Sequence, residues 1–599
     1  MAHISTERIA ALRQWMKENR FKAFVVPTAD PHGSEYIAAH WKCREWLTGF
    51  DGSAGTAVVT EDEALLWTDS RYWLQAKEQL DGSEIRLMRD GDEGVPSVEH
   101  WLREHFRGNS YFFVGKDEGL VPKEANEGIP HFDDIDHLPP SCDKDPFETI
   151  WHDRPALPDA PVRLQPLEYA GCSIAEKMKM TEEWLGQYAG SCSLIVSDLA
   201  EIAWMLNLRG SDIDFNSVFY AYLLISFPEK TATLCIDEKK VPAEVREYLS
   251  ANGISMAPYD SLPEASHKVA KKYVLVCKGL TKNLYSKVYS DIRKTYIIDS
   301  PLQHFKALKN PTEQQGFRRA MERDGVAMVR MLRWLEENPR QTELSVAQKL
   351  ESLRAEGENY CGASFETISA YGAHAAIVHY EPTAESNIPL QQNGLLLLDS
   401  GGQYLDGTTD ITRTIALGPL CDEEKLIYTL VLKGHIALSM AHFPKGTPGI
   451  ALDALARKDM WSEGYDYGHG TGHGVGSNLC VHEGPQQIRK NLNAPSQYAF
   501  EPGMTITDEP GIYVEGKYGV RIENMLLCHA DEETPFGNFC SFEVLTLCPI
   551  DTRPIVLSML TAEERDWLNT YHSHVRSRLL PLLSDAADKE WLENATKPI

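Results

Sequence analysis

Proline interrupts this chain at two places, and these breaks constrain its fold more than any other feature. Six prolines stand among acidic residues between positions 139 and 161, and proline has no amide hydrogen to give to a helix or a sheet. A second break lies at Ser300-Pro301 and at Lys309-Asn310-Pro311. The breaks predict three domains, at residues 1–150, 151–308 and 309–599.

Length and composition agree with several domains. The chain has 599 residues, and 43% of them are hydrophobic. Domains typically have ~100–200 residues, so a chain of this length is expected to form several. Its net charge of −28 repels nucleic acid and anionic lipid, and no apolar run approaches the ~20 residues that cross a bilayer. Its 12 cysteines form no C-x-x-C motif. We therefore predict a soluble cytoplasmic protein with neither nucleic acid nor membrane as a partner.

The two segments before Pro301 follow a similar pattern. Each begins with a helical pattern and then carries a tryptophan, Trp46 or Trp204, followed by strand-like runs. Each also has an apolar strand that ends in aspartate, at residues 65–69 and 233–237. A duplicated α/β domain would explain the pattern. Because unrelated α/β domains share such patterns, two unrelated domains stay open as the alternative.

The third segment has helical patterns at both ends. The first covers residues 312–338, with Thr312 as its expected cap. The last begins at a capping box, Thr561 to Glu564, and carries an apolar stripe. The stripe residues are Trp567, Tyr571, Val575 and Leu579. We expect this helix to cover the core of the domain, with a dimer surface as the alternative.

Two aspartates flank a predicted hairpin in the third segment. A buried-strand pattern at residues 395–398 ends in Asp399 and a glycine turn, and the chain returns through residues 403–413. The hairpin would bring Asp399 and Asp410 to the same end. Aspartates near turns are also common at surfaces, so the pair alone does not define a site.

Glycine occupies every second position from Gly468 to Gly476. This spacing matches neither phosphate-binding glycine motif, and so much glycine disfavours a helix. Close approach of the backbone to a ligand or to another segment would explain it. His469 and His473 lie in the run, and His482 follows it. A flexible loop with incidental histidines is the competing interpretation.

Two strand patterns further on contain carboxylates. Glu509 ends the pattern at residues 504–509, and Arg521 and Glu523 share a face of the mostly apolar pattern at residues 520–527. A charge in such a strand is costly without a partner. A structural ion pair of Arg521 with Glu523 or its neighbours is the alternative to a functional site.

Together these motifs supply four carboxylates and a histidine. Four carboxylates in one pocket, with a charge of about −4, could not all stay ionised unless cations balanced them. Two divalent metals would do so, and oxygen-rich ligands with one histidine favour manganese over the ligand sets of structural zinc. A pair of metals ~3.5–4 Å apart activates a hydroxide, so the sequence predicts a hydrolase.

The motifs DSGGQYLDGTTDITRT, GHGTGHGVG, TDEPG and RIEN occur in an order and at spacings similar to those of the pita-bread metallopeptidases. The upstream segments FETISAYGAHAAIVHY, GFDGSAGTAVVT and WTDSRYW further resemble the three-domain, eukaryotic-type Xaa-Pro aminopeptidases (aminopeptidase P). The resemblance covers nearly the whole chain. It implies an α/β (α+β) protein, in which two related creatinase-like amino-terminal α/β domains precede a pita-bread catalytic domain with a carboxy-terminal helical extension.

The resemblance also implies which residues form the site. Its metal ligands fall on Asp399, Asp410, His473, Glu509 and Glu523. Its catalytic residues fall on His379, His469, His482 and Glu509. Its substrate-binding positions fall on the same three histidines and on Tyr513, Arg521 and Arg44. The implied cofactor is two divalent metal ions, with manganese expected first and zinc or cobalt as alternatives.

The implied enzyme is a metal-dependent exopeptidase that removes the amino-terminal residue from peptides with proline in the second position, and forms a homodimer. A hydroxide activated by two metals would attack the carbonyl before proline. Prolidase, which shares the metal site but is restricted to dipeptides, is the main alternative. A non-enzymatic pita-bread binding protein is a second alternative, and the complete ligand set disfavours it.

Overall fold

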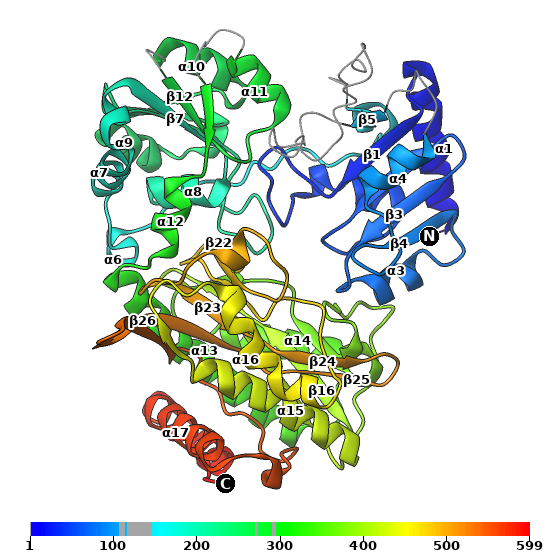
Figure 1. The fold of residues 1–599 in the computed structure, drawn as a ribbon, viewed down its shortest axis with the longest axis vertical. Helices are drawn as coiled ribbons and strands as arrows, with labels where there is room; N and C mark the ends of the chain where they lie inside the picture. The colour runs from blue at the N-terminus through cyan, green and yellow to red at the C-terminus, as the bar shows by residue number, and fades with distance from the viewer. Residues whose placement is uncertain (1, 107–113, 117–144, 270–272, 290–294) are drawn as a thin grey trace. The chain divides into compact units, whose positions relative to one another are not determined.

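The structure is a computed structural model that describes residues 2–106, 114–116, 145–269, 273–289 and 295–599 (Figure 1). By internal contacts the chain divides into two compact units. The first comprises Met1–Leu164, Ser173–Asp214 and Val218–Leu302, and the second comprises Gln165–Cys172, Phe215–Ser217 and Gln303–Ile599. The predicted first domain and most of the predicted second domain fall in the first unit, so the predicted domain boundaries stay predictions. Residues 139–144 of the predicted proline-rich linker lie outside the described residues.

The first sheet of the first unit has the strand order β4-β3-β2-β1-β5. The pairs β4–β3 and β1–β5 are parallel, and the pairs β3–β2 and β2–β1 are antiparallel. The strands are β1 Ala23–Pro27, β2 Thr56–Thr60, β3 Ala64–Thr68, β4 Ile85–Arg89 and β5 Val114–Lys116. The helices of this part are α1 Ala2–Asn19, α2 Cys43–Thr48, α3 Trp73–Gln79 and α4 Val98–His105.

The second sheet has the order β11-β10-β9-β7-β12-β13. From β11 to β12 the pairs are parallel, antiparallel, antiparallel and parallel, the same sequence as in the first sheet. The strands are β7 Cys192–Val196, β9 Tyr222–Ser226, β10 Thr231–Cys235, β11 Ile254–Ala257, β12 Tyr273–Cys277 and β13 Thr295–Ile298. The helices are α7 Ile174–Leu185, α8 Leu199–Leu206, α9 Ala243–Ala251, α10 Leu262–Val269 and α11 Lys282–Tyr289. Identical order and sense in five strands support the predicted duplication.

The second unit carries the polar motifs on small antiparallel sheets. One sheet has the order β15-β16-β19 and another β20-β27-β26-β23. Their strands are β15 Ile368–Tyr371, β16 Leu395–Ser400, β19 Ile411–Ala416, β20 His442–Pro444, β23 Thr505–Asp508, β26 Asn524–Thr534 and β27 Gly537–Val544. The helices are α13 Pro311–Glu337, α14 Glu343–Arg354, α15 Asp422–Ser439 and α16 Gly449–Ser462, and α12 Pro301–Ala307 has its last five residues in this unit. Because β16 and β19 pair antiparallel, with Asp399 opposite Thr412, the predicted return of the chain is confirmed.

The cap of the long helix α13 lies two residues before the expected one. The Asn310 side chain, not Thr312, caps it by accepting hydrogen bonds from the Thr312 and Glu313 amides (2.9 and 3.1 Å). Pro311 fits at the first helical position because its missing amide hydrogen would have no partner there. The predicted cap at Thr312 is therefore wrong.

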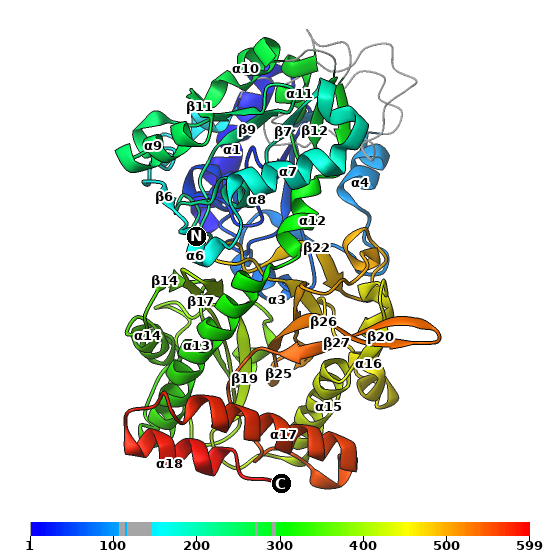
Figure 2. The same cartoon turned by 90° about the vertical axis from the view of Figure 1, so that its left-hand side faces the viewer.

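Two helices end the chain, α17 Ala562–Leu579 and α18 Ala586–Ala595 (Figure 2). Thr561 caps α17 through the predicted capping box. Tyr571, Val575 and Leu579 pack in one buried cluster with residues of α15. The stripe therefore covers the core, as the sequence favours. Among the described residues, no helix combines the length and the apolar character needed to cross a membrane.

Candidate metal centre

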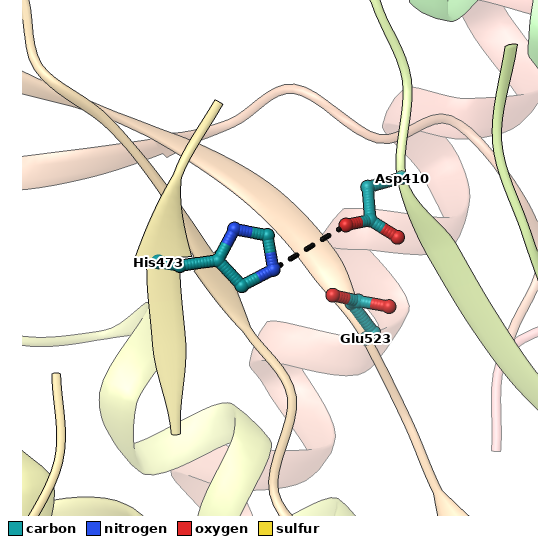
Figure 3. A group of neighbouring side chains, drawn as sticks. All are labelled: Asp410, His473 and Glu523. Carbon is teal, nitrogen blue, oxygen red and sulfur yellow. Dashed lines mark ion pairs between the residues drawn. The ribbon is translucent and has the colours of Figure 1, made fainter. Parts of the chain in front are cut away.

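Three polar side chains from distant parts of the sequence meet in the second unit (Figure 3). Asp410 lies just before β19, His473 is the middle residue of β21 (Gly472–Gly474), and Glu523 follows β25 (Tyr518–Arg521). One ligand atom from each of the three side chains lies within 4.8 Å of the others. Two carboxylates and an imidazole this close together form a candidate metal centre.

Glu523 interrupts the strand that alternation predicts over residues 520–527. That prediction is wrong, because the chain leaves β25 after Arg521 and resumes pairing in β26. At the break, the Glu523 amide donates to the Thr412 carbonyl (3.0 Å), and the Thr412 hydroxyl donates to the Glu523 carboxylate (2.9 Å). The buried Arg413 donates to the Glu523 carbonyl (2.7 Å). β19 therefore orients Glu523 through both backbone and side chains.

The glycine run lets the backbone around His473 pass close to neighbouring segments. A Cβ atom at Gly472 would overlap the Thr507 carbonyl oxygen, and one at Gly474 would overlap the Glu483 carbonyl oxygen. Only glycine fits at these two positions. The predicted close approach of backbone to another segment is confirmed here, although β21 is the only part of the run that forms a strand.

A hydrogen bond fixes which nitrogen of His473 faces the carboxylates. The His473 Nδ1 lies 3.0 Å from the Gly474 carbonyl oxygen. A carbonyl oxygen can only accept, so Nδ1 carries the hydrogen, and in the neutral imidazole Nε2 keeps a lone pair. The Nε2 lies 3.5 Å from Asp410 Oδ2 and 3.6 Å from Glu509 Oε1. The lone pair and the two carboxylates repel one another, and a cation between them would remove that repulsion.

Asp399 and Glu509 lie beside this group. Glu509 directly follows β23, and Asp399 lies in β16. The Asp399 Oδ2 accepts a hydrogen bond from Arg521 Nη2 (2.6 Å), while its Oδ1 is buried with no hydrogen-bond partner in the part of the chain that the structure describes. A buried carboxylate oxygen without a partner is costly. Oδ1 is therefore available as a metal ligand.

Burial and mutual repulsion change the acidity of these carboxylates. Burial, reinforced by the Asp399 and Glu509 carboxylates, raises the pKa of Asp410 well above its usual range. Burial and the Asp410 carboxylate do the same to the pKa of Glu523. Burial raises the pKa of Glu509 to about 7, although the Arg521 guanidinium opposes the shift. The carboxylates therefore lack sufficient positive charge from the protein, and divalent cations fit the donor set that remains.

Arg521 links three of the other predicted residues, Asp399, Tyr513 and His469. It donates to the Tyr513 hydroxyl (2.7 Å), which lies 2.8 Å from His469 Nε2. The His469 Nδ1 lies 2.7 Å from the Gly470 carbonyl oxygen and carries the hydrogen, so Nε2 accepts from Tyr513. Burial raises the pKa of Tyr513 to about 12, which keeps that hydroxyl protonated. Arg521 therefore orients Tyr513, and Tyr513 orients His469.

The two remaining predicted histidines occupy different positions. The ring of His482 lies 4.3 Å from the ring of His473, centroid to centroid, with the planes at 76°. His379 lies in the segment between β15 and β16, and the carbonyl of the preceding Val378 accepts from Arg521 Nη2 at 3.4 Å. Both histidines thus lie next to residues that contact the carboxylate cluster.

Sequence patterns did not reveal the residue that holds the glycine run. Arg457 of α16 is buried and donates to the carbonyl oxygens of Tyr467 (2.8 Å) and His469 (3.1 Å). Its guanidinium also binds the Asp453 carboxylate (2.6 Å), which accepts from the Thr471 hydroxyl. One charged pair on α16 therefore fixes the backbone on both sides of His469. An arginine four residues after an aspartate on a helix is usually a surface pair, so this signal was too weak to use.

Arg44 lies in the first unit and is engaged there. Its guanidinium is buried against Phe50 and donates to the Phe50 and Gly52 carbonyl oxygens and to the Thr28 hydroxyl. These bonds hold α2 to the following loop. The substrate-binding role that the resemblance implies for Arg44 stays a prediction.

Such a cluster, in a unit of this architecture, defines a metallohydrolase. Residues 315–530 match Metallopeptidase family M24, and residues 538–599 match the C-terminal region of peptidase M24. The Creatinase/Prolidase N-terminal domain matches twice, at residues 8–126 and 153–313. The predicted fold class, with two related amino-terminal domains before the catalytic domain, is confirmed.

Known proteins narrow this class further. Aminopeptidase P2 of Arabidopsis thaliana is 38% identical over 99% of this chain and 88% of its own length. The crystal structure of X-prolyl aminopeptidase from Caenorhabditis elegans, described as a cytosolic enzyme with a di-nuclear active site, matches with a TM-score of 0.93 and 35% identity over 99% of this chain and 100% of that chain. An Xaa-Pro dipeptidase from Bacillus anthracis matches with a TM-score of 0.51 and 26% identity, over 63% of this chain and 99% of its own. The chain belongs to the aminopeptidase P group of metallopeptidase family M24.

Proposed function

We propose that this protein is an Xaa-Pro aminopeptidase, which hydrolyses the bond between an amino-terminal residue and a proline in the second position. The observation that carries the proposal is the cluster of Asp410, His473 and Glu523, whose two carboxylates are buried. It lies in a chain that aligns over 99% of its length with an aminopeptidase P and with an X-prolyl aminopeptidase.

The proposed cofactor is two divalent metal ions. Asp399, Asp410, His473, Glu509 and Glu523 are the proposed ligands. The described di-nuclear site of the Caenorhabditis elegans relative supports the number of ions. Manganese is the proposed ion because four carboxylates with one imidazole form a hard, oxygen-rich set; zinc and cobalt are the alternatives.

The protein's own residues then have separate tasks. When bound, two such ions supply Lewis acidity and activate a water molecule as the nucleophile. His482 and His379 are the proposed hydrogen-bond donors to the oxygen of the carbonyl before proline. Glu509 is the proposed proton carrier. A proline nitrogen has no hydrogen in the peptide and leaves more easily once protonated, so the acid has a defined task.

His469, Tyr513 and Arg521 are proposed to hold the substrate. The contacts from Arg521 to Tyr513 and from Tyr513 to His469 give these groups one fixed arrangement. Arg521 also binds Asp399, so the same arrangement extends to a proposed metal ligand. Substrate position and metal position would therefore be coupled through Arg521.

Among the alternative functions, prolidase differs least from an Xaa-Pro aminopeptidase, because it shares the metal site and differs in its restriction to dipeptides. The Bacillus anthracis dipeptidase aligns with only 63% of this chain, whereas the X-prolyl aminopeptidase aligns with 99%. The duplicated creatinase-like domain therefore favours the aminopeptidase. A non-enzymatic protein is disfavoured by the complete carboxylate set. A homodimer is also proposed on the resemblance alone, and a cytoplasmic location on the cytosolic description of the relative.

The deciding experiment compares Xaa-Pro dipeptides with Xaa-Pro-Yaa tripeptides, before and after chelation and with manganese added back. We expect cleavage of the tripeptides, release of the first residue, and dependence on metal. Cleavage of dipeptides alone would identify a prolidase. No cleavage of either by the metal-loaded protein would refute the proposal.

A further inference from the structure

A carboxylate outside the candidate metal centre lies at the centre of a second network in the same unit. Glu343 is the first residue of α14, and it is fully buried, with 0% of its surface exposed. A carboxylate in the first turn of a helix gains from the unpaired amide groups there. That gain is small compared with the cost of burying a charge, so the remaining partners of Glu343 decide why it is there.

Those partners lie between residues 371 and 388. The Glu343 carboxylate accepts from the Tyr371 amide (2.8 Å) and the Ile388 amide (3.3 Å). It also accepts from the Tyr380 hydroxyl (2.9 Å) and lies 2.9 Å from His374 Nδ1. The rings of His374 and Tyr380 stack with centroids 4.4 Å apart. One side chain thus gathers both ends and the middle of this segment.

The segment needs such an anchor because sheet pairing holds it only at its carboxy-terminal end, where an isolated antiparallel bridge joins Thr342 and Pro389. β15 ends at Tyr371, and β16 begins at Leu395. Apart from that bridge, the stretch between them consists of one short 3-10 turn, Gly372–Ala376, and irregular backbone. Irregular backbone is placed by side-chain contacts rather than by a ladder of hydrogen bonds.

The same segment carries His379, the proposed oxyanion donor. Tyr380, which donates to Glu343, is its immediate neighbour, and Val378 on the other side accepts from Arg521. The segment is therefore fixed at two points around His379. Glu343 binds one point, and Arg521, which also binds Asp399, binds the other.

We infer that Glu343, acting with Tyr380 and His374, is a positioning residue for His379. The inference rests on the proposed function, because His379 acts only if the proposed chemistry occurs. Glu343 contacts neither substrate nor metal in this role. It sets where His379 stands relative to the metal centre, and a displacement of about 1 Å in a catalytic group can cost about 10²-fold in rate.

The test is a double-mutant cycle. Glu343→Gln keeps the shape of the side chain but places an amide where oxygens accept hydrogen bonds. We expect it to lower kcat by roughly 10- to 100-fold with a smaller change in KM and with both metals retained. In a His379→Ala background the same change should cost less than about 2-fold, because the residue that it positions is already gone.

Glu351→Gln is the matched control. Glu351 lies on the same helix and also accepts from a tyrosine hydroxyl, Tyr360 (2.7 Å), but that tyrosine lies outside the segment. We expect near wild-type kcat for it. If Glu343→Gln does not fold, Tyr380→Phe removes a single hydroxyl and should show the same dependence on His379.

The outcomes are distinguishable. Equal fold-losses with and without His379, or a loss of stability with unchanged kcat per folded molecule, would overturn the positioning role and leave the proposed function intact. Failure of the metal-loaded wild type to cleave any Xaa-Pro-Yaa peptide would refute the proposed function itself, and the inference with it.

Discussion

Two of the clusters of buried charged side chains in the second unit differ in what neutralises their carboxylates. In one, the Glu483 carboxylate accepts from Lys306 Nζ (2.8 Å) and from Lys309 Nζ. Burial would raise the pKa of Glu483, but the two lysines outweigh it and lower that pKa. In the other cluster, Asp410 and Glu523 face further carboxylates, and both pKa values rise.

The difference teaches how to separate a structural cluster from a site. Glu483 directly follows His482, and it is as deeply buried as the candidate ligands. Neither sequence position nor burial distinguishes the two clusters. The distinction is the source of the opposite charge, since every buried charge needs one. Glu483 receives it from two lysines of the same chain, and the candidate centre must take most of it from solvent.

Chelation should produce the largest effect, because it removes the metal ions. These ions supply the positive charge that the protein itself does not provide at the candidate centre. We expect activity on an Xaa-Pro-Yaa peptide to fall to background in a metal-free preparation and to return when manganese is added. Kinetics paired with elemental analysis measures this. Full turnover in a preparation that contains no metal would show that the candidate centre is not a metal site.

A matched pair of variants sharpens this result. Glu523→Gln should lower metal affinity by more than the roughly 10- to 100-fold typical of groups that only support a ligand. Glu483→Gln should leave the metal content unchanged, although both variants remove one buried negative charge. Equal metal loss in the two variants would mean that the clusters are not independent.

The next largest effect should come from the structural cluster. Lys309→Met leaves Glu483 with one lysine, and breaking a buried ion pair typically costs about 3–5 kcal/mol. We expect a loss of that order in the free energy of unfolding, measured by urea denaturation, with metal stoichiometry unchanged. Adding Glu483→Gln to Lys309→Met should recover part of the loss. No recovery would show that Glu483 is not the main partner of Lys309.

Variants of the three histidines should distinguish the proposed metal ligand from the proposed catalytic residues. His473→Ala should lower metal stoichiometry, whereas His482→Ala and His379→Ala should keep the metal and lower kcat by roughly 10²- to 10³-fold, as removal of an oxyanion donor does. The measurements are metal content and kcat on the same samples. Metal loss in His482→Ala but not in His473→Ala would place the ligand assignment in the wrong register.

The smallest expected effect concerns stability. The contributions of the two clusters to the free energy of unfolding should depend on pH in opposite directions. In metal-free protein the pKa of Glu509 is raised from 4.5 to about 7, so its contribution to stability is present below about pH 4.5 and is lost as pH rises through about 7. Glu483 has a lowered pKa, so its contribution is present above pH 4.5 and is lost as pH falls through its folded pKa.

Urea midpoints measured across this pH range test both signs. Glu509→Gln should flatten the loss between about pH 4.5 and 7 in metal-free protein. Glu483→Gln should change the pH dependence of the urea midpoint only at acidic pH, below about pH 4.5. A Glu509→Gln profile that overlays the wild type would mean that Glu509 stays ionised throughout.

Much of the fold follows from local pattern. The burial of Ile9, Leu12 and Met16 on α1 follows from apolar spacing, and the repeated strand order follows a similarity that the sequence already shows. The predicted strand over residues 520–527 fails because tertiary hydrogen bonds from β19 break it at Glu523, and alternation alone cannot detect them. Sequence patterns likewise missed Arg457, whose targets are backbone carbonyl groups rather than a motif.

By itself, the sequence determined the kinds of donor in the centre and their order along the chain, because carboxylates, imidazoles and obligatory glycines are properties of residues. Only the tertiary structure decided which carboxylates meet lysines and which meet one another. Glu483 and Lys306 are 177 residues apart in the chain but 2.8 Å apart in space, and electrostatic energy depends on the distance in space and on burial. No local pattern encodes that distance, so the contrast between a neutralised carboxylate and a metal-binding one exists only in the folded protein.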